Sequence, residues 1–534
     1  MQQPFDGPVN KRHYHKLYPG FNFLICFMLS LLAYGCIDHT SERTTKTTRL
    51  IQNALVVDGS GAAGFHADVR FDGGGIIAVG KLEVLATDSV SNAHGMVLAP
   101  GFIDSHSHHD DGLEISPLAI AAISQGITTI VVGNDGESNY PLDDFKLQLK
   151  SNPPALNVAS YTGHGSIRFE VMGADYKREA SQEEISQMQT LLAKDMQSGS
   201  LGLASGLEYD PGIYSNTDEL ITLAKTAAAG GGRYVSHMRS EDRAFYAALE
   251  ELILIGKEAA LPVQISHMKL AALNIWGQAS DLLRRLEAAR AEGIDVTADV
   301  YPYTYWQSTL TVLLPERDFN DLDAARFALE QLAPADGLTL ADYAPDTDLV
   351  GKTVAEIATA RGTSNEETYL QLIRDAYEGF TIEELAVLQE PRESVMGVSM
   401  SEQDVAALVT WQHSNICSDG ASQGHPRGHG AFPRALRMYV REQGLVTLEE
   451  MIRKMTSLSA EHIGIEGRGL IKPGYSADLV LFDPQTIADN ASIDQQNLVS
   501  DGIVGVWVNG VSVWDHQHAT GTKPGVFISR AQAE

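Results

Sequence analysis

The stretch Ala99-Pro-Gly-Phe-Ile-Asp-Ser-His-Ser-His-His-Asp110 decides the fold. An apolar run leads through Pro-Gly into Phe102-Ile-Asp104, which predicts a short buried strand. Residues two apart on a strand point to the same side, so His106 and His108 would aim two imidazoles at one point. This arrangement suits metal ligation, and further histidines and an aspartate follow other apolar runs of the chain.

Apolar, strand-like runs alternate with segments of helical period over most of the chain. We expect eight strands, at 101–108, 127–133, 156–163, 201–206, 233–238, 262–268, 295–302 and 415–420. This alternation is typical of a parallel α/β fold, and eight units predict a closed (β/α)8 TIM-type barrel over residues 99–464. A doubly wound open sheet is the alternative. Helical patterns between the last two strands predict a helical insertion at 316–391 on the active-site face.

The segments on either side of the predicted barrel have a different sequence pattern. Residues 49–98 and 465–534 contain β-branched runs separated by glycine turns, so we expect them to pair into one small β-sandwich domain. The 534 residues carry a formal net charge of −30, which argues against nucleic acids and anionic membrane surfaces as partners. A small-molecule substrate is expected instead.

The N-terminus has the pattern of a secretory signal. Lys11, Arg12 and Lys16 precede an apolar segment at 21–33, and Ala33-Tyr-Gly-Cys36 follows it. We expect residues 1–36 to be a lipoprotein-type signal peptide and 37–48 a linker. The chain would then be exported to a bacterial periplasm and anchored by a lipid on Cys36, with a retained membrane anchor as the alternative. Membrane contact is expected only through this segment.

Polar side chains gather where the predicted strands end, and these ends carry the reactive groups of barrel enzymes. Imidazole and carboxylate together suit zinc and similar divalent metals, and one or two ions are expected. Asp419 would take a proton from water and deliver it to a leaving nitrogen. Asp135 could bridge two metals or bind one. The candidate metal ligands are His106, His108, Asp135, His237 and His267.

This constellation resembles the amidohydrolase superfamily, and within it the D-aminoacylase (N-acyl-D-amino-acid deacylase) family, from about Leu50 to Trp514. Besides the opening stretch, matching motifs are Gly163-His-Gly-Ser-Ile-Arg168, Gly202-Leu-Ala-Ser-Gly-Leu-Glu-Tyr-Asp-Pro211, Ser236-His-Met-Arg239, Ile265-Ser-His-Met-Lys269, Ser418-Asp-Gly420 and His425-Pro-Arg427. The resemblance implies metal ligation by the four histidines, with Asp419 as acid/base. It also implies hydrolysis of N-acyl-D-amino acids beneath a helical insertion.

The resemblance further implies that Lys269, and with it Tyr301 and Arg239, binds the substrate carboxylate. Structural ion pairs are the alternative for Lys269 and Arg239. His164 and Arg427 are additional candidates for substrate contact. Alternatively, His164 ties its strand to the following loop, and Arg427 orders the loop that contains it.

The sequence departs from the family pattern in two places. Asp135 stands where the family usually has a metal-bridging cysteine, which leaves metal preference and count open, and Glu137 is a competing candidate. The stretch 303–307 is bulky, which predicts a reshaped acyl or side-chain pocket. Residues 201–206 lack lysine, which counts against the hydantoinase and dihydroorotase branches, where a carboxylated lysine bridges the metals.

Two alternative functions follow from the same residues. One is hydrolysis of another small amide or of a dipeptide that contains a D-residue. The other is a non-catalytic metal-binding or solute-binding lipoprotein, although such a protein needs no acid/base at Asp419.

Overall fold

The structure is a computed structural model that describes residues 47–380 and 392–530. The predicted signal peptide, most of the predicted linker and part of the predicted insertion lie outside the described residues. Within these two ranges, no helix combines the length and the apolar character that a membrane crossing requires.

Eight parallel strands line the centre of the molecule. Their order follows the chain, and β8 and β9 form one strand position that is interrupted only at Tyr161. They are β6 (Phe102–Asp104), β7 (Ile127–Val132), β8 (Asn157–Ser160) with β9 (Thr162–Gly163), β10 (Gly202–Gly206), β11 (Arg233–His237), β12 (Val263–Ile265), β13 (Val296–Val300) and β17 (Ser414–Ile416).

The barrel is closed by hydrogen bonds between its first and last strands. Ser107 and Gly420 form a parallel bridge, and the backbone N–H of His108 donates to the carbonyl of Gly420 at 2.9 Å. On the other side, Leu201 N–H donates to Ser160 O at 2.9 Å, which joins β8 to β10. The predicted parallel barrel is therefore confirmed, and the open sheet is excluded.

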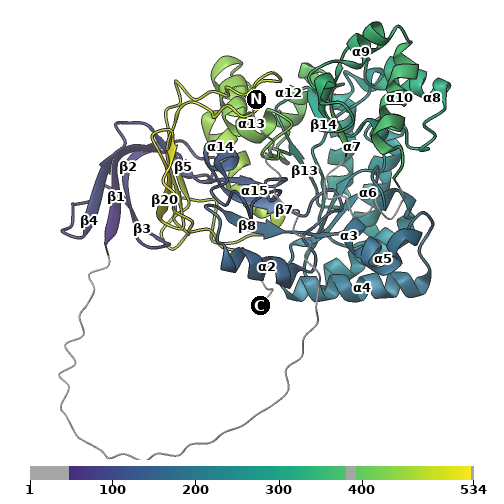
Figure 1. Ribbon diagram of the computed structural model, residues 1–534. Coiled ribbons are helices and arrows are strands. Elements are labelled where there is room, and N and C mark those ends of the chain that lie inside the picture. The colour runs from purple at the N-terminus through teal and green to yellow at the C-terminus, as the bar shows by residue number, and fades with distance from the viewer. Residues whose placement is uncertain (1–46, 381–391, 531–534) are drawn as a thin grey trace, which may run out of the picture. The chain divides into compact units, whose positions relative to one another are not determined.

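Helices surround these strands (Figure 1). In α4, a capping box between Ser181 and Glu184 starts the helix, and Ile185, Met188 and Leu192 face the core. The others around the barrel are α1 (Ile120–Ile123), α2 (Leu142–Ser151), α3 (His164–Met172), α4 (Gln182–Gln197), α5 (Thr217–Ala229), α6 (Phe245–Ala259), α7 (Ala279–Ala291), α12 (Glu402–Thr410), α13 (Arg427–Ala435), α14 (Leu448–Met455) and α15 (Ser457–Ile463).

The segment between β13 and α12 corrects the prediction of a purely helical insertion. It contains α8 (Leu322–Phe327), α9 (Val354–Arg361) and α10 (Asn365–Tyr377), but also an antiparallel sheet ordered β14-β16-β15. These strands are β14 (Tyr305–Ser308), β15 (Leu338–Tyr343) and β16 (Glu393–Val398). Leu338 and Leu340 are buried and alternate with more exposed residues. This short two-residue period was masked by the helical patterns on either side of it.

Both ends of the described chain build one sheet of nine strands. The two ends meet where β5 (Val97–Pro100) pairs with β18 (Leu479–Phe482). The N-terminal half of the sheet also contains β1 (Thr48–Val56), β2 (Phe65–Phe71), β3 (Ile76–Gly80) and β4 (Asp88–Asn92). The C-terminal half also contains β19 (Ile503–Val508), β20 (Val511–Asp515) and β21 (His518–Ala519). The predicted pairing of the two ends is thus confirmed. Residues 524–530 differ, because they leave this sheet: Val158 N–H donates to Val526 O at 3.0 Å, beside β8.

Candidate metal centre

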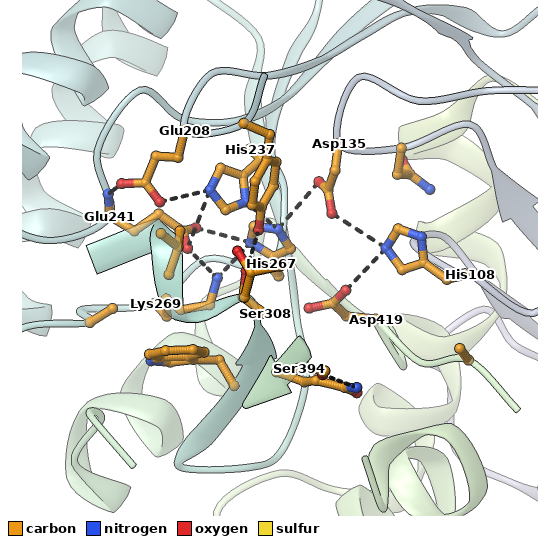
Figure 2. A pocket seen from close by; sticks show the side chains of 18 of the residues that line it. His108, Asp135, Glu208, His237, Glu241, His267, Lys269, Ser308, Ser394 and Asp419 are labelled. Atoms are coloured by element: carbon orange, nitrogen blue, oxygen red, sulfur yellow. Dashed lines mark hydrogen bonds and ion pairs between the residues drawn. The ribbon is translucent and has the colours of Figure 1, made fainter. Parts of the chain in front are cut away.

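The predicted metal ligands and Asp419 converge at the carboxyl ends of the barrel strands, and Figure 2 shows His108, Asp135, His237, His267 and Asp419 of this group. His106 and His108 follow β6, Asp135 follows β7, His267 follows β12 and Asp419 follows β17, whereas His237 ends β11. Three of these residues have left-handed backbone angles, with φ of 54° at Asp135, 35° at His267 and 48° at Asp419. Such angles are uncommon outside glycine and occur preferentially at functional sites.

Asp135 lies at the centre of the cluster. Its Oδ2 is 3.2 Å from Nε2 of His106 and 3.3 Å from Nε2 of His108, and its Oδ1 is 3.3 Å from Nε2 of His267. Asp419 Oδ1 is 3.5 Å from Nε2 of His106 and 3.4 Å from Nε2 of His108. One ligand atom from each of His106, Asp135, His267 and Asp419 lies within 4.8 Å of the others.

A second group shares His267 with the first. His237, Glu241 and His267 each offer a ligand atom within 4.8 Å of the others. His237 Nδ1 is 3.0 Å from His267 Nε2, and His237 Nε2 is 2.9 Å from Glu208 Oε2. Glu208 and Glu241 are not among the site residues predicted from the sequence. Their positions in the sequence could have indicated them: Glu208 follows the fourth strand, and Glu241 lies four residues after His237.

The donor set fits a divalent ion of the zinc class. Its atoms are imidazole nitrogens and carboxylate oxygens, which zinc accepts. Nδ1 of His106 and Oδ1 of Asp135 are buried without a hydrogen-bond partner, as expected for atoms in or beside a ligand shell. Cys417 is buried and its thiol donates to Asp299, so the cluster itself contains no sulfur donor among the described residues.

The carboxylates and imidazoles of the cluster shift one another's pKa values. Burial raises the pKa of Asp135, but His106 and His267 oppose this and hold it well below its usual range. Burial also raises the pKa of Asp419, and Arg427 and His267 more than offset it. For His267, burial and Lys269 lower the pKa, whereas Glu241 and Asp135 act against them and raise it to about 10. The carboxylates are therefore ionised and stabilise positive charge between them.

Two of the predicted substrate-binding residues line the same cavity. Lys269 Nζ lies 2.6 Å from Glu241 Oε2 and 2.7 Å from His267 Nδ1. Arg427 places an NH1 nitrogen 2.7 Å from Asp419 Oδ2. Tyr301 is buried behind the cavity wall, with the Arg427 guanidinium 4.6 Å from its ring centre.

Arg239 and His164 are not brought to the cavity, which contradicts their predicted substrate contact. Arg239 pairs with Glu251 at 2.9 and 3.0 Å, across the start of α6. His164 begins α3 and pairs with Glu219 of α5 at 2.8 Å, so its ring faces the helix layer instead of the barrel mouth. Glu137 lines the cavity but is exposed and belongs to neither ligand group, so the geometry favours Asp135.

The cavity over the cluster has a volume of about 520 Å³. One part of its wall is formed by the ligand cluster and the strand ends. The segment between β13 and α12, which we call the insertion, contributes another part through Trp306, Gln307, Ser308, Thr309, Val312, Leu313, Tyr377 and Ser394, and loops after the barrel strands complete the wall. Figure 2 shows Ser394 across the cavity from Asp135 and Glu208. A molecule inside the cavity would contact both parts.

Comparison with known sequences matches this chain to one family along most of its length. The pattern of the amidohydrolase family matches residues 408–514. The chain is 35% identical to a D-aminoacylase of Alcaligenes xylosoxydans xylosoxydans over 511 residues, which cover 91% of this chain and 98% of that protein. It is 33% identical to the N-acyl-D-glutamate deacylase of the same organism, with coverage of 91% and 97%.

Solved structures give the same result. A crystal structure of D-aminoacylase superposes with a TM-score of 0.79 at 34% identity, over 90% of this chain and 99% of that one. The N-acyl-D-glutamate deacylase of Bordetella bronchiseptica, solved with zinc and a phosphonate mimic of the tetrahedral intermediate, superposes with a TM-score of 0.80 at 30% identity, over 91% and 100%. Fold and sequence are therefore similar over almost the whole described chain.

Proposed function

This chain belongs to the amidohydrolase family, in the group of the D-aminoacylases and N-acyl-D-amino-acid deacylases, and on that premise we propose that it hydrolyses the amide bond of N-acyl-D-amino acids with a divalent metal ion. One observation carries the proposal. The cluster of His106, His108, Asp135, His267 and Asp419 lies at the mouth of the barrel, within a cavity that can hold a small amide.

The cluster provides ligands for one or two ions. His106, His108, Asp135 and His267 would hold one ion, and His237, Glu241 and His267 form the group that would hold a second. When bound, zinc acts as a Lewis acid on the amide carbonyl and lowers the pKa of water to about 7. Glu208 and Glu241 contact His237 and His267 and would fix the orientation of both rings.

Asp419 is placed to move the proton. Its carboxylate is buried and lines the cavity beside the ligands, where a bound substrate would contact it. It would take a proton from the attacking water and pass it to the amide nitrogen as the C–N bond breaks. The products are the carboxylate of the acyl group and the free amino acid. Arg427 holds the other oxygen of Asp419 and thereby fixes the direction of this transfer.

The substrate carboxylate needs a cation near the cluster. Lys269 and Arg427 are the two lysine or arginine side chains that line the cavity within the described ranges. We assign the carboxylate to them, because Arg239 is bound to Glu251 outside the cavity. Tyr301 would support Arg427 from behind through its ring.

The assay that tests this function compares matched N-acetyl-D- and N-acetyl-L-amino acids with the zinc-loaded protein. We expect turnover of the D-series and its loss in Asp419→Asn at unchanged metal content. Turnover confined to cyclic amides would reject the deacylase function, and turnover of D-residue dipeptides alone would favour the peptide alternative. If no compound is turned over and Asp419→Asn changes nothing, the binding-protein alternative is favoured.

We also propose that the chain is exported and lipid-anchored in a bacterial periplasm. The order of basic residues, apolar segment and Cys36 supports this. Fractionation of cells that express the wild type and Cys36→Ser tests it. The wild type should be in the membrane fraction and the variant should leave it. An unchanged distribution would contradict the lipid anchor.

A further inference from the structure

The insertion gives the cavity an apolar wall, whereas the ligand cluster consists of imidazoles and carboxylates. Trp306, Val312, Leu313 and Tyr377 form this surface, which we call the insertion wall. Leu313 is buried, Val312 and Tyr377 are half-buried, and all three line the cavity. The flanking side chains are the neutral Gln307, Ser308, Thr309 and Ser394.

Trp306 is held in one position. It pairs with Gly397 across β14 and β16, and a Cβ at Gly397 would lie 2.3 Å from the indole ring, so only glycine leaves room for it. The indole Nε1–H donates to Ser399 Oγ at 2.6 Å, which satisfies its polar atom away from the cavity. The ring therefore presents a fixed apolar surface to a ligand.

No lysine or arginine of the described ranges lies on the insertion wall. The lining cations, Lys269 and Arg427, are at the ligand cluster. Two arginines approach the wall from behind, but both bind backbone carbonyls: Arg243 donates to Leu313 O at 2.8 Å, and Arg317 donates to Thr311 O and Glu208 O at 2.7 Å each. Residues 381–391, which precede β16, contain no lysine or arginine in their sequence.

The remaining charges of the cavity are negative. Besides the ligand cluster and Glu208, the lining contains Asp111, Glu137 and Asp242. An N-acyl amino acid has one α-carboxylate, which Lys269 and Arg427 can bind. A second carboxylate on the side chain would face the insertion wall without a cation and would be repelled by these acids.

We propose that the insertion wall selects substrates with a neutral, apolar D side chain and rejects D-aspartate and D-glutamate derivatives. This inference rests on the proposed deacylase function. The apolar, neutral lining of the wall suits side chains such as leucine, methionine and phenylalanine. Trp306 and Val312 are the residues that determine this specificity, through contact with the side chain of the substrate.

The test measures kcat/KM of the zinc-loaded enzyme for N-acetyl-D-leucine, -methionine, -phenylalanine, -aspartate and -glutamate. We expect the neutral substrates to exceed the acidic ones by at least about 100-fold. If the acidic substrates are turned over as well or better, the inference is wrong while the deacylase function stands. If no member of either class is turned over, the proposed function fails and the inference fails with it.

Two variants test whether the insertion wall distinguishes neutral from acidic substrates. Val312→Arg places a cation on the insertion wall and should raise the glutamate-to-leucine ratio of kcat/KM at least about tenfold. Val350→Arg is the matched control, because Val350 is an exposed valine of the same insertion outside the cavity, and it should leave the ratio unchanged. Trp306→Ala should raise KM for the neutral substrates while metal content stays constant. An unchanged ratio in a folded Val312→Arg protein would overturn the assignment.

Discussion

Asp299 Oδ1 lies 3.6 Å from Nδ1 of His106, while Nε2 of the same ring faces Asp135 at 3.2 Å. Asp299 Oδ1 also accepts a hydrogen bond from the backbone N–H of His267 at 2.6 Å, and its Oδ2 accepts one from Gln264 at 2.6 Å. One buried carboxylate on β13 therefore touches two of the proposed metal ligands from behind. It is a positioning residue for His106 and His267.

Asp299→Asn should weaken metal binding without changing the ligands themselves. We expect a 10- to 100-fold loss of zinc affinity, measured by competition with a chelator. Asp295→Asn is the control, because Asp295 is half-exposed at the entry of β13 and pairs with Arg290 at 2.8 Å, away from the cluster. Equal affinities of Asp299→Asn and the wild type would show that the carboxylate has no positioning role.

Asp135→Ala and Glu137→Ala distinguish the two candidates for the acidic ligand after β7. Asp135 contacts His106, His108 and His267, whereas Glu137 is exposed at the rim. Asp135→Ala should lower the affinity for zinc at least about tenfold, and Glu137→Ala should leave it within about twofold. Metal content after dialysis checks both, and the reverse result would assign the role to Glu137.

Lys269→Met and Arg239→Met separate a cavity cation from a structural ion pair. Lys269→Met should lower kcat/KM for N-acetyl-D-leucine at least about tenfold, since it removes a charge from the cavity. Arg239→Met should leave KM within about twofold and cost about 1 kcal/mol of unfolding free energy, because its pair with Glu251 is partly exposed. A large change of KM in Arg239→Met would restore its predicted substrate role.

Glu393, a buried residue of the insertion, makes the stability of the protein depend on pH. Its side chain is fully buried and accepts from Leu310 N–H at 2.8 Å and from Tyr377 at 3.2 Å, and burial raises its pKa to about 7 from an ordinary value of 4.5. Between these values the unfolded chain has lost a proton that the folded protein still binds. The stability contributed by this group therefore falls as the pH rises from 4.5 to 7.

Glu393→Gln cannot ionise, so its unfolding free energy should rise relative to the wild type between pH 5 and pH 8. Denaturant unfolding should show a relative gain of roughly 1–3 kcal/mol across that range. Glu378→Gln, at an exposed position after α10, is the control and should show no such trend. A variant-to-wild-type difference that is constant with pH would contradict the assigned pKa.

The sequence predicted the barrel because its short strands are buried on both faces and most of them are rich in apolar residues, as in 127–132. It missed β15 and β16, because these short strands lie among helical patterns and pair only with one another and β14. Strand pairing over a long sequence separation is not visible in local periodicity. The same holds for residues 524–530, whose partner is β8.

Some residues of the candidate site could also be predicted from the sequence, whereas others could not. His106, His108, Asp135, His237, His267 and Asp419 could be found in the sequence, because each stands at or just after the end of a barrel strand, and parallel strands end at one face of a barrel. Glu208 and Glu241 also follow strands, but their importance depends on which loops fold back toward the cluster. Arg239 was predicted to bind substrate and lies two residues after His237, but its side chain points away and pairs with Glu251.

The sequence by itself therefore determined the barrel, the joining of the two chain ends and the residue types of the proposed metal centre, because these depend on periodicity and on position along a strand. Only the tertiary structure decided which cations line the cavity, that Asp299 supports two ligands and that Trp306 closes one wall. These features depend on side-chain direction and on contacts between segments far apart in the chain, and no local pattern encodes them.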